Sequence, residues 1–201
     1  MKRLLALLTA LMLMLCLSPS VAEQAGEPST LVVVFSHAGE NWQVGVVEEG
    51  NTMKMAKIIA EQLHAELFEI VPEVPYPVGY EEMKDIAQKE LDEDARPAYV
   101  GDVENWETVD TVFIGYPIWW GGMPKIVQRF LENHDFTGKT VIPFNTHGGS
   151  GQGGTQTVIE QMLTGAKVLK GLAVNGVQAQ NDPEKTLQDV ESWLKSIGLS
   201  E

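Results

Sequence analysis

The sequence predicts an α/β fold in which five parallel strands form a doubly wound sheet with helices on both faces. Five apolar runs, most of them rich in β-branched residues, alternate along the chain with segments of helical periodicity. Right-handed crossovers of this length between parallel strands leave few other topologies. In such sheets, ligands bind at the loops that follow the carboxyl ends of the strands, so those loops are where function is sought.

The five strands are expected at regular intervals. Residues 31–35 (LVVVF) form an uninterrupted apolar run, which is typical of a central strand buried on both faces. A second run at 67–71 ends at Pro72, which cannot donate a hydrogen bond to a neighbouring strand. The other three strands are expected at residues 111–115 (TVFIG), 140–145 (TVIPFN) and 168–174 (VLKGLAV).

Helices are expected between these strands. The first starts at Thr52, where Asn51 or Thr52 can cap it, and apolar residues follow at helical spacing. Residues 80–92 predict an acidic helix whose charged side is interpreted as solvated. Three more helices are expected at 124–133, 155–163 and 183–197, the last with a proline in its first turn.

Composition narrows the class of protein. The chain has 201 residues, of which 44% are hydrophobic and 21% charged, as in ordinary globular domains. Fourteen basic and 28 acidic residues give a net charge of −14, which disfavours nucleic acid and anionic lipid surfaces as partners. No apolar run reaches the roughly 18 to 20 residues of a membrane-spanning helix, so no span is expected in the mature chain.

Residues 1–22 are interpreted as a signal peptide. Lys2 and Arg3 precede a 14-residue apolar stretch at 4–17, and small residues allow cleavage after Ala22. Export to the periplasm, the cell surface or the medium is therefore expected. Removal of the peptide leaves 179 residues and changes the net charge from −14 to −16, since two basic residues are lost.

Residues 23–30 are expected to be a short linker, and residues 31–201 the folded domain. The single cysteine, Cys16, leaves with the signal peptide, which excludes disulfides and cysteine metal sites from the mature chain. Lipid attachment at Cys16 is disfavoured because the preceding Leu15 is large.

The first candidate loop, residues 36–51 (SHAGENWQVGVVEEGN), leads to the N-terminus of the first helix. Ser36, Asn51 and Thr52 can hold an anion there with neutral donors and the free backbone N–H groups. The spacing resembles a nucleotide-triphosphatase loop, but Asn51 occupies the lysine position, which favours a monophosphate over a triphosphate. The alternative is that Asn51 and Thr52 only cap the helix.

The second candidate loop is residues 116–124 (YPIWWGGMP). It places Tyr116, Trp119 and Trp120 at the end of a strand, where a flat ligand can stack on aromatic rings. A hydrophobic lid over the sheet, or a surface for a partner protein, is the competing interpretation.

The third candidate loop is residues 146–154 (THGGSGQGG). Gly149, Gly151 and Gly154 match the dinucleotide fingerprint, but the following strand ends at Val174 and Asn175, without the acid that binds a ribose. The match is therefore interpreted as chance, in a loop whose backbone offers donors to a ligand. The four histidines show no metal-ligand spacing, so no metal site is expected.

Together these loops resemble those of the flavodoxin-like family, over residues 31 to about 197. The pieces that carry the resemblance are LVVVFSHAGEN followed by GNT, then GYPIWWGGMP, then FNTHGGSG. Flavodoxins have a short Ser-x-Thr-Gly-Asn-Thr turn, whereas here about a dozen residues separate Ser36 from Gly50. This longer form is similar to a subgroup of small flavodoxin-like proteins with the same YPIWWG element.

The resemblance implies the strand order 2-1-3-4-5 and a bound FMN, with no catalytic side chain required. It implies that the phosphate binds at the first loop, the ribityl chain along the start of the second loop, and the isoalloxazine ring between the second and third loops. The implied contacts are Ser36, Asn51 and Thr52 for the phosphate, Tyr116, Pro117 and Ile118 for the ribityl chain, and Trp119, Trp120, Thr146, His147, Gly148, Gly149 and Gly151 for the ring.

The function expected from this resemblance is electron transfer by an exported FMN protein, to a redox partner protein or a small acceptor. An FMN-dependent NAD(P)H oxidoreductase acting on quinones or similar acceptors is the first alternative. The second is a flavin-free binding module with the same fold, which holds if the long loop blocks the phosphate site.

Overall fold

The computed structural model describes residues 29–200, so the expected signal peptide, its cleavage site and Cys16 lie outside the described residues. The main sheet is parallel, and its strands are ordered β4-β1-β7-β8-β10. This is the predicted order 2-1-3-4-5, which is confirmed. The strands are β1 (Ser29–Val34), β4 (Glu66–Glu69), β7 (Val109–Pro117), β8 (Thr140–His147) and β10 (Leu172–Asn175).

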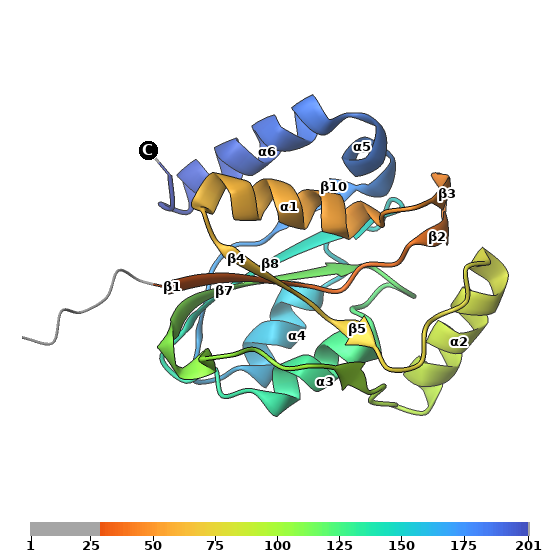
Figure 1. The fold of residues 1–201 in the computed structure, drawn as a ribbon, viewed down its shortest axis with the longest axis horizontal. Helices are drawn as coiled ribbons and strands as arrows, with labels where there is room; N and C mark the ends of the chain where they lie inside the picture. The colour runs from red at the N-terminus through yellow and green to blue at the C-terminus, as the bar shows by residue number, and fades with distance from the viewer. Residues whose placement is uncertain (1–28, 201) are drawn as a thin grey trace, which may run out of the picture.

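Helices cover both faces of this sheet (Figure 1). One face carries α1 (Asn51–Leu63), α5 (Gly176–Asn181) and α6 (Pro183–Ser196), and the other carries α3 (Lys125–Asn133) and α4 (Thr155–Met162). The alternation of side chains along β1 divides the core accordingly. Val32 and Val34 pack with Met55 of α1, whereas Leu31 and Val33 belong to the cluster on the other face.

Two predicted strands are divided in the structure. The run at 67–71 ends as a main-sheet strand at Glu69, and β5 (Val71–Pro72) instead pairs antiparallel with β6 (Tyr99–Val100). The run at 168–174 is interrupted between β9 (Lys167–Val168) and β10, and both pieces pair with β8. Gly171 lies in that interruption, where a Cβ would come within 2.6 Å of the Pro143 carbonyl oxygen.

The long loop after β1 contains a hairpin that the sequence analysis did not predict. Its strands, β2 (Gly39–Asn41) and β3 (Gly45–Val47), pair antiparallel. The turn between them uses left-handed backbone at Gln43 (φ +63°) and Gly45 (φ +91°). The short helix α5 and a 3₁₀ turn at Trp106–Thr108 were also not predicted.

Helix α2 (Tyr80–Asp92) has the predicted bounds but lies beyond the carboxyl ends of the strands rather than on a face of the sheet (Figure 1). The chain leaves for α2 and returns at a neck formed by β5 and β6, where the Glu73 N–H also bonds the Ala98 carbonyl at 2.9 Å. At its base, Asp94 accepts hydrogen bonds from Arg96 (2.8 Å) and from the nearly buried Lys125 (2.6 Å).

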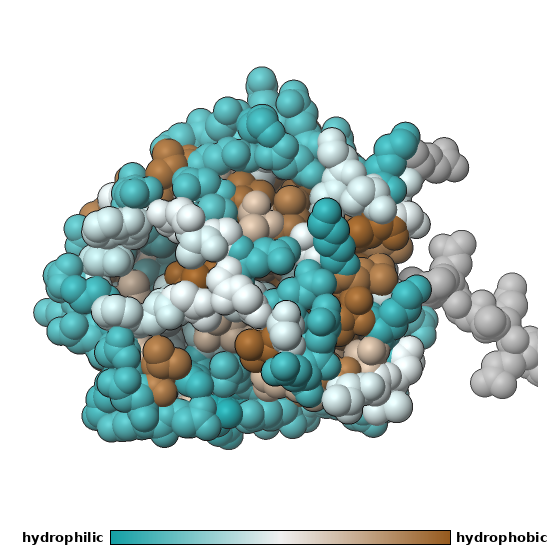
Figure 2. All heavy atoms as spheres, turned by 180° about the vertical axis from the view of Figure 1, so that it is seen from behind, coloured by the Kyte–Doolittle hydropathy of each residue, from teal (hydrophilic) through white to brown (hydrophobic). Residues whose placement is uncertain are grey.

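The face opposite to the view of Figure 1 is mostly hydrophilic. Seen from behind, hydrophilic residues form the outline of the molecule and hydrophobic residues occupy smaller areas between them (Figure 2). Within residues 29–200, none of the helices combines the length and the apolar composition that crossing a bilayer requires.

Candidate functional site

A cavity of about 280 Å³ opens at the carboxyl ends of the strands, close in size to the smallest pockets that hold ligands, roughly 300 Å³. It brings together all three candidate loops, the first of which contains the β2–β3 hairpin. Residues of α2 and Gly176 of α5 complete its wall. Ten of the thirteen candidate residues line it, namely Ser36, Asn51, Thr52, Pro117, Ile118, Trp119, Trp120, Thr146, His147 and Gly148. Tyr116, Gly149 and Gly151 do not.

The N-terminus of α1 forms one end of the cavity. Ser36 Oγ accepts a hydrogen bond from the Met53 N–H at 3.0 Å, which leaves the Ser36 O–H free to donate. Thr52 and Thr146 join their hydroxyls at 2.7 Å, tying α1 to the end of β8. Within the described part of the chain, the N–H groups of Asn51 and Thr52 have no acceptor. These neutral donors fit a singly esterified phosphate at a helix N-terminus.

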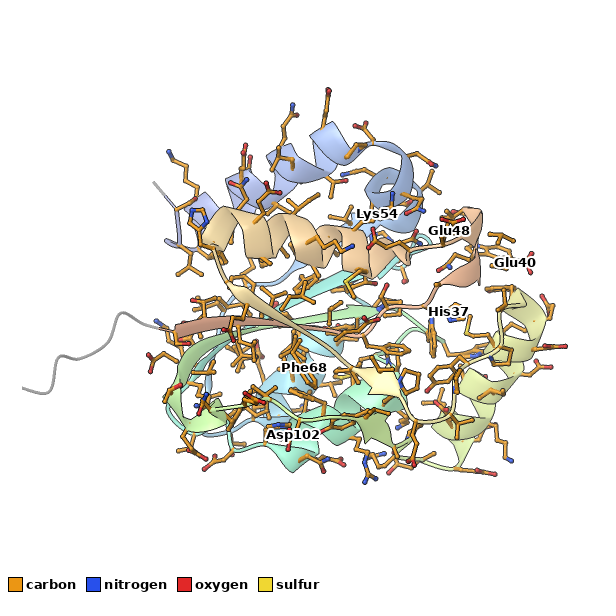
Figure 3. The ribbon with its side chains drawn as sticks, viewed as in Figure 1. His37, Glu40, Glu48, Lys54, Phe68 and Asp102 are labelled. Carbon is orange, nitrogen blue, oxygen red and sulfur yellow. The ribbon has the colours of Figure 1, made fainter. Side chains whose placement is uncertain are left out.

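Three side chains carry a buried polar atom without a partner among the described residues; one is Gln180 Oε1, and the other two belong to the cavity. These two are Asn51 Oδ1 and His37 Nε2, and both side chains line the cavity with less than a tenth of their surface exposed. Burial lowers the pKa of His37, so this ring is neutral near pH 7. Figure 3 shows His37 between the end of β1 and α2. Leaving such atoms unpaired is costly, which indicates that a ligand completes the site.

The second loop is a tight turn. Trp119 and Gly122 exchange two backbone hydrogen bonds of 2.9 Å, and positive φ angles at Trp120 (+49°) and Gly121 (+76°) define a type I′ turn. Left-handed backbone is unusual for a residue as large as tryptophan. It is held here by the Trp120 indole N–H, which donates to the Lys84 carbonyl at 3.0 Å.

Trp119 is packed edge-on rather than left free as a stacking platform. Its ring centroid lies 5.3 Å from that of Phe35 and 5.1 Å from that of Tyr76, at interplanar angles of 88° and 80°. The T-shaped contacts fix the indole as part of the cavity wall. Tyr116, expected to contact the ligand, is instead fully buried, and its hydroxyl donates to Thr155 Oγ1 at 2.8 Å.

A hydrogen bond within the third loop determines which ring nitrogen of His147 carries the proton. The Gly149 N–H donates to His147 Nδ1 at 2.9 Å, and burial lowers the pKa of this histidine. The ring is therefore neutral, with its proton on Nε2, where it can donate to a ligand. The loop is closed by Asn145, whose side-chain amide donates to the Gly151 carbonyl at 3.1 Å.

The sequence analysis missed the side chains that complete the wall. The hairpin contributes Asn41 and Trp42, and α2 contributes Tyr80, Met83, Lys84 and Ala87. A tryptophan inside a glycine-rich loop was the available signal for the hairpin. Met83 and Ala87 are the buried residues of α2, and a helical pattern in the sequence does not indicate whether such residues cover a cavity or the sheet.

No group of three or more metal-ligating side chains occurs among residues 29–200. The cavity therefore offers neutral hydrogen-bonding groups and aromatic rings, with Lys84 as its single cationic side chain among the described lining residues. This donor set suits a ligand with one phosphate, a polar chain and a flat ring system.

Comparison with known proteins agrees with this architecture. A family model described as Flavodoxin matches residues 45–195. A proposed flavoprotein of Bacteroides eggerthii is 30% identical, with a TM-score of 0.67, over 84% of this chain and 97% of that one. A second proposed flavoprotein, from Bacteroides uniformis, is 29% identical with a TM-score of 0.66, over 84% and 98%.

A flavoprotein of Lactobacillus acidophilus, solved in complex with FMN, shares the fold at 21% identity and a TM-score of 0.59, over 73% of this chain and 93% of that one. The comparison with curated proteins gives no match. The family model covers most of the chain, and the strand order of the sheet is that of the flavodoxin-like fold. The chain belongs to the flavodoxin family.

Proposed function

We propose that this protein binds FMN in the cavity and transfers electrons between partners outside the cytoplasm. The observation that carries the proposal is the neutral donor set at the start of α1, where the N–H groups of Asn51 and Thr52 have no acceptor within residues 29–200, beside the Ser36 hydroxyl. A flavin phosphate supplies the acceptors that these groups need.

The other residues of the cavity have roles that follow from their contacts. Thr146 and His147 lie where a flavin ring can receive hydrogen bonds from the third loop, and Trp119 and Trp120 exclude water from one side of the cavity. FMN supplies one- and two-electron chemistry when bound, and the protein sets its potential through hydrogen bonds, stacking and local charge. The lining residues hold and orient the cofactor.

Export supports a role in electron transfer outside the cytoplasm, to a redox partner protein or a small acceptor. This part of the proposal rests on the signal-peptide pattern of residues 1–22. The absence of cysteine from residues 23–201 is compatible with an oxidising compartment.

The test is retention of FMN by the purified protein after saturation and desalting, read as flavin absorption bands at about 370 and 450 nm. Titrations with FMN and with riboflavin, which lacks the phosphate, then measure phosphate recognition. We expect FMN to bind at least about tenfold more tightly than riboflavin, since riboflavin leaves the donors at α1 unpaired.

Asn51→Asp is the matched variant. It keeps the shape of the side chain and places a negative charge at the first position of α1, which stabilises the helix but repels a phosphate. We expect the affinity for FMN to fall at least about tenfold while riboflavin binding changes little. A wild-type protein that retains no flavin, or that binds both flavins equally, contradicts the proposal.

A further inference from the structure

The β2–β3 hairpin carries a large aromatic side chain to the mouth of the cavity. Trp42 lies between the two short strands, lines the cavity, and is 57% exposed. Neither core cluster includes it, so packing of the domain does not account for a tryptophan at this position. We infer that Trp42 binds the flavin ring and determines the affinity of the site for planar heteroaromatic ligands, an inference that rests on the proposed function.

The position of the indole is fixed from two sides. Tyr80, at the start of α2, supports it with ring centroids 5.6 Å apart and planes 32° from parallel. On the other side lies Gly148, where an added Cβ would be 2.6 Å from Trp42 Cδ1. The absence of a side chain at Gly148 therefore allows the indole to approach the third loop, to which the proposed function assigns the ring.

The hairpin is held in place before any ligand binds. Asn41 donates through its side-chain amide to the carbonyls of His37 and Gly39, each at 3.1 Å. Glu40 binds both the segment before α2 and the start of α2: its N–H donates to the Val78 carbonyl at 2.8 Å, and its carboxylate accepts from the Tyr80 N–H at 3.0 Å. A preorganised aromatic side chain loses little conformational entropy on binding, so its contact contributes fully to affinity.

The chemistry of Trp42 separates its role from that of the α1 terminus. Its indole recognises the flat ring and has no means of binding a phosphate, whereas Ser36, Asn51 and Thr52 act on the phosphate. A change at Trp42 must therefore affect FMN and riboflavin equally. A change at the phosphate end must affect FMN alone.

The test compares Trp42→Leu with Trp42→Phe by calorimetric titration of the purified protein with FMN and with riboflavin. Leucine keeps apolar bulk against Gly148 but removes the aromatic face, so we expect both affinities to fall by about tenfold or more, the effect of losing one stacking partner. Trp42→Phe keeps an aromatic face, so we expect it to retain most of the wild-type affinity for both flavins. Val46→Ala is the control, because Val46 is 75% exposed on the same hairpin and does not line the cavity; both affinities stay unchanged.

The outcomes are distinguishable from failure of the proposed function. If the wild-type protein binds neither flavin, the proposed function fails. If the wild-type protein binds FMN and Trp42→Leu binds both flavins as tightly, Trp42 does not contact the ring and the inference is overturned. A loss for FMN without a loss for riboflavin also overturns it, because the hairpin would then act through the phosphate end. Circular dichroism of each variant confirms that the fold is intact.

Discussion

His37 and Asn51 keep polar atoms buried without a partner in the described structure, and both line one cavity. A buried acceptor or donor without a hydrogen bond typically costs 1 to 3 kcal/mol, roughly, in folding free energy. Such a cost at two neighbouring positions is expected where a ligand later supplies the missing bonds. The residues that destabilise the free protein are then the ones that bind the ligand.

The variant His37→Phe tests whether His37 lowers the stability of the flavin-free protein and contributes to ligand binding. We expect the free energy of unfolding of the flavin-free protein to rise by about 1 kcal/mol, because the unpaired nitrogen is removed while the edge-on contact with Trp119 is retained. The affinity for FMN should fall in the same variant. Urea denaturation with and without saturating FMN measures both effects. A variant that is less stable without flavin, yet binds it normally, would show that His37 is only a packing residue.

The pH dependence of the free energy of unfolding provides a second test of the role of His37. Burial lowers the pKa of His37 from its usual 6.5, so the unfolded chain takes up a proton before the folded one does as the pH falls. Stability is therefore complete above about pH 6.5 and decreases below it. His147, whose pKa is also lowered by burial, contributes in the same direction. The loss of stability below pH 6.5 should be shallower in His37→Phe, and an unchanged slope would contradict the assignment.

At the scale of elements, the hairpin and α2 form one wall because Glu40 joins them. Its carboxylate accepts from the Tyr80 N–H, at the positive end of the α2 dipole. Figure 3 shows Glu40 on the side of the hairpin next to α2 and Glu48 on the side next to α1. The start of α2 has no cap of its own, since Gly79 has no side chain.

Glu40→Ala is expected to loosen the start of α2 by about 1 kcal/mol, the usual cost of a lost N-terminal cap. Hydrogen exchange measured by mass spectrometry should show faster exchange across residues 78–84, with little change in the central strands. Glu48→Ala serves as the control, because this exposed side chain has no hydrogen bond within residues 29–200. Equal exchange in the two variants would show that Glu40 does not hold the helix.

The elements were predictable to different degrees, and the reasons are physical. Buried strands such as β1 and β7 consist of apolar, β-branched residues, so their pattern is unambiguous. The hairpin has only three residues in each strand, which is too short for any periodicity, and its turn depends on left-handed backbone at Gln43. For α2, the pattern gave the bounds, but the location depends on the neck formed by β5 and β6.

At the scale of the whole molecule, the candidate site was predictable as a set of loops but not as a cavity. Ser36, Asn51 and Thr146 were expected because they follow strands whose carboxyl ends share one edge of the sheet. Trp42 and Met83 come from segments that the main sheet does not position, so strand order alone could not place them there. Tyr116 was misplaced for the converse reason: β7 extends to Pro117, and alternation turns the Tyr116 side chain into the core.

The net charge, −14 for the full chain and −16 without residues 1–22, leads to a prediction about the potential of bound FMN. A negative protein disfavours the added negative charge of the reduced flavin, so the midpoint potential should lie below that of free FMN. It should rise when ionic strength increases from about 20 mM to about 500 mM, because salt screens the surface charges. Spectroelectrochemical titration at both salt concentrations measures this.

Charge-reversal variants localise the effect. Glu82→Lys, on the helix α2 that supplies part of the cavity wall, should raise the potential more than Glu191→Lys, on α6, which contributes no residue to the wall. A potential at or above that of free FMN in low salt would show that local hydrogen bonds outweigh the charge of the protein.

The neck formed by β5 and β6 brings the two ends of residues 73–98 together, with Val71 opposite Val100. A segment whose ends meet can be lengthened, shortened or exchanged while every strand of the main sheet keeps its register. In this chain the segment supplies one wall of the cavity, and the α1 terminus, which we propose binds the phosphate, lies outside that segment. Residues 73–98 can therefore vary, in evolution or by design, and change which molecules reach the ring. The residues proposed to bind the phosphate stay the same.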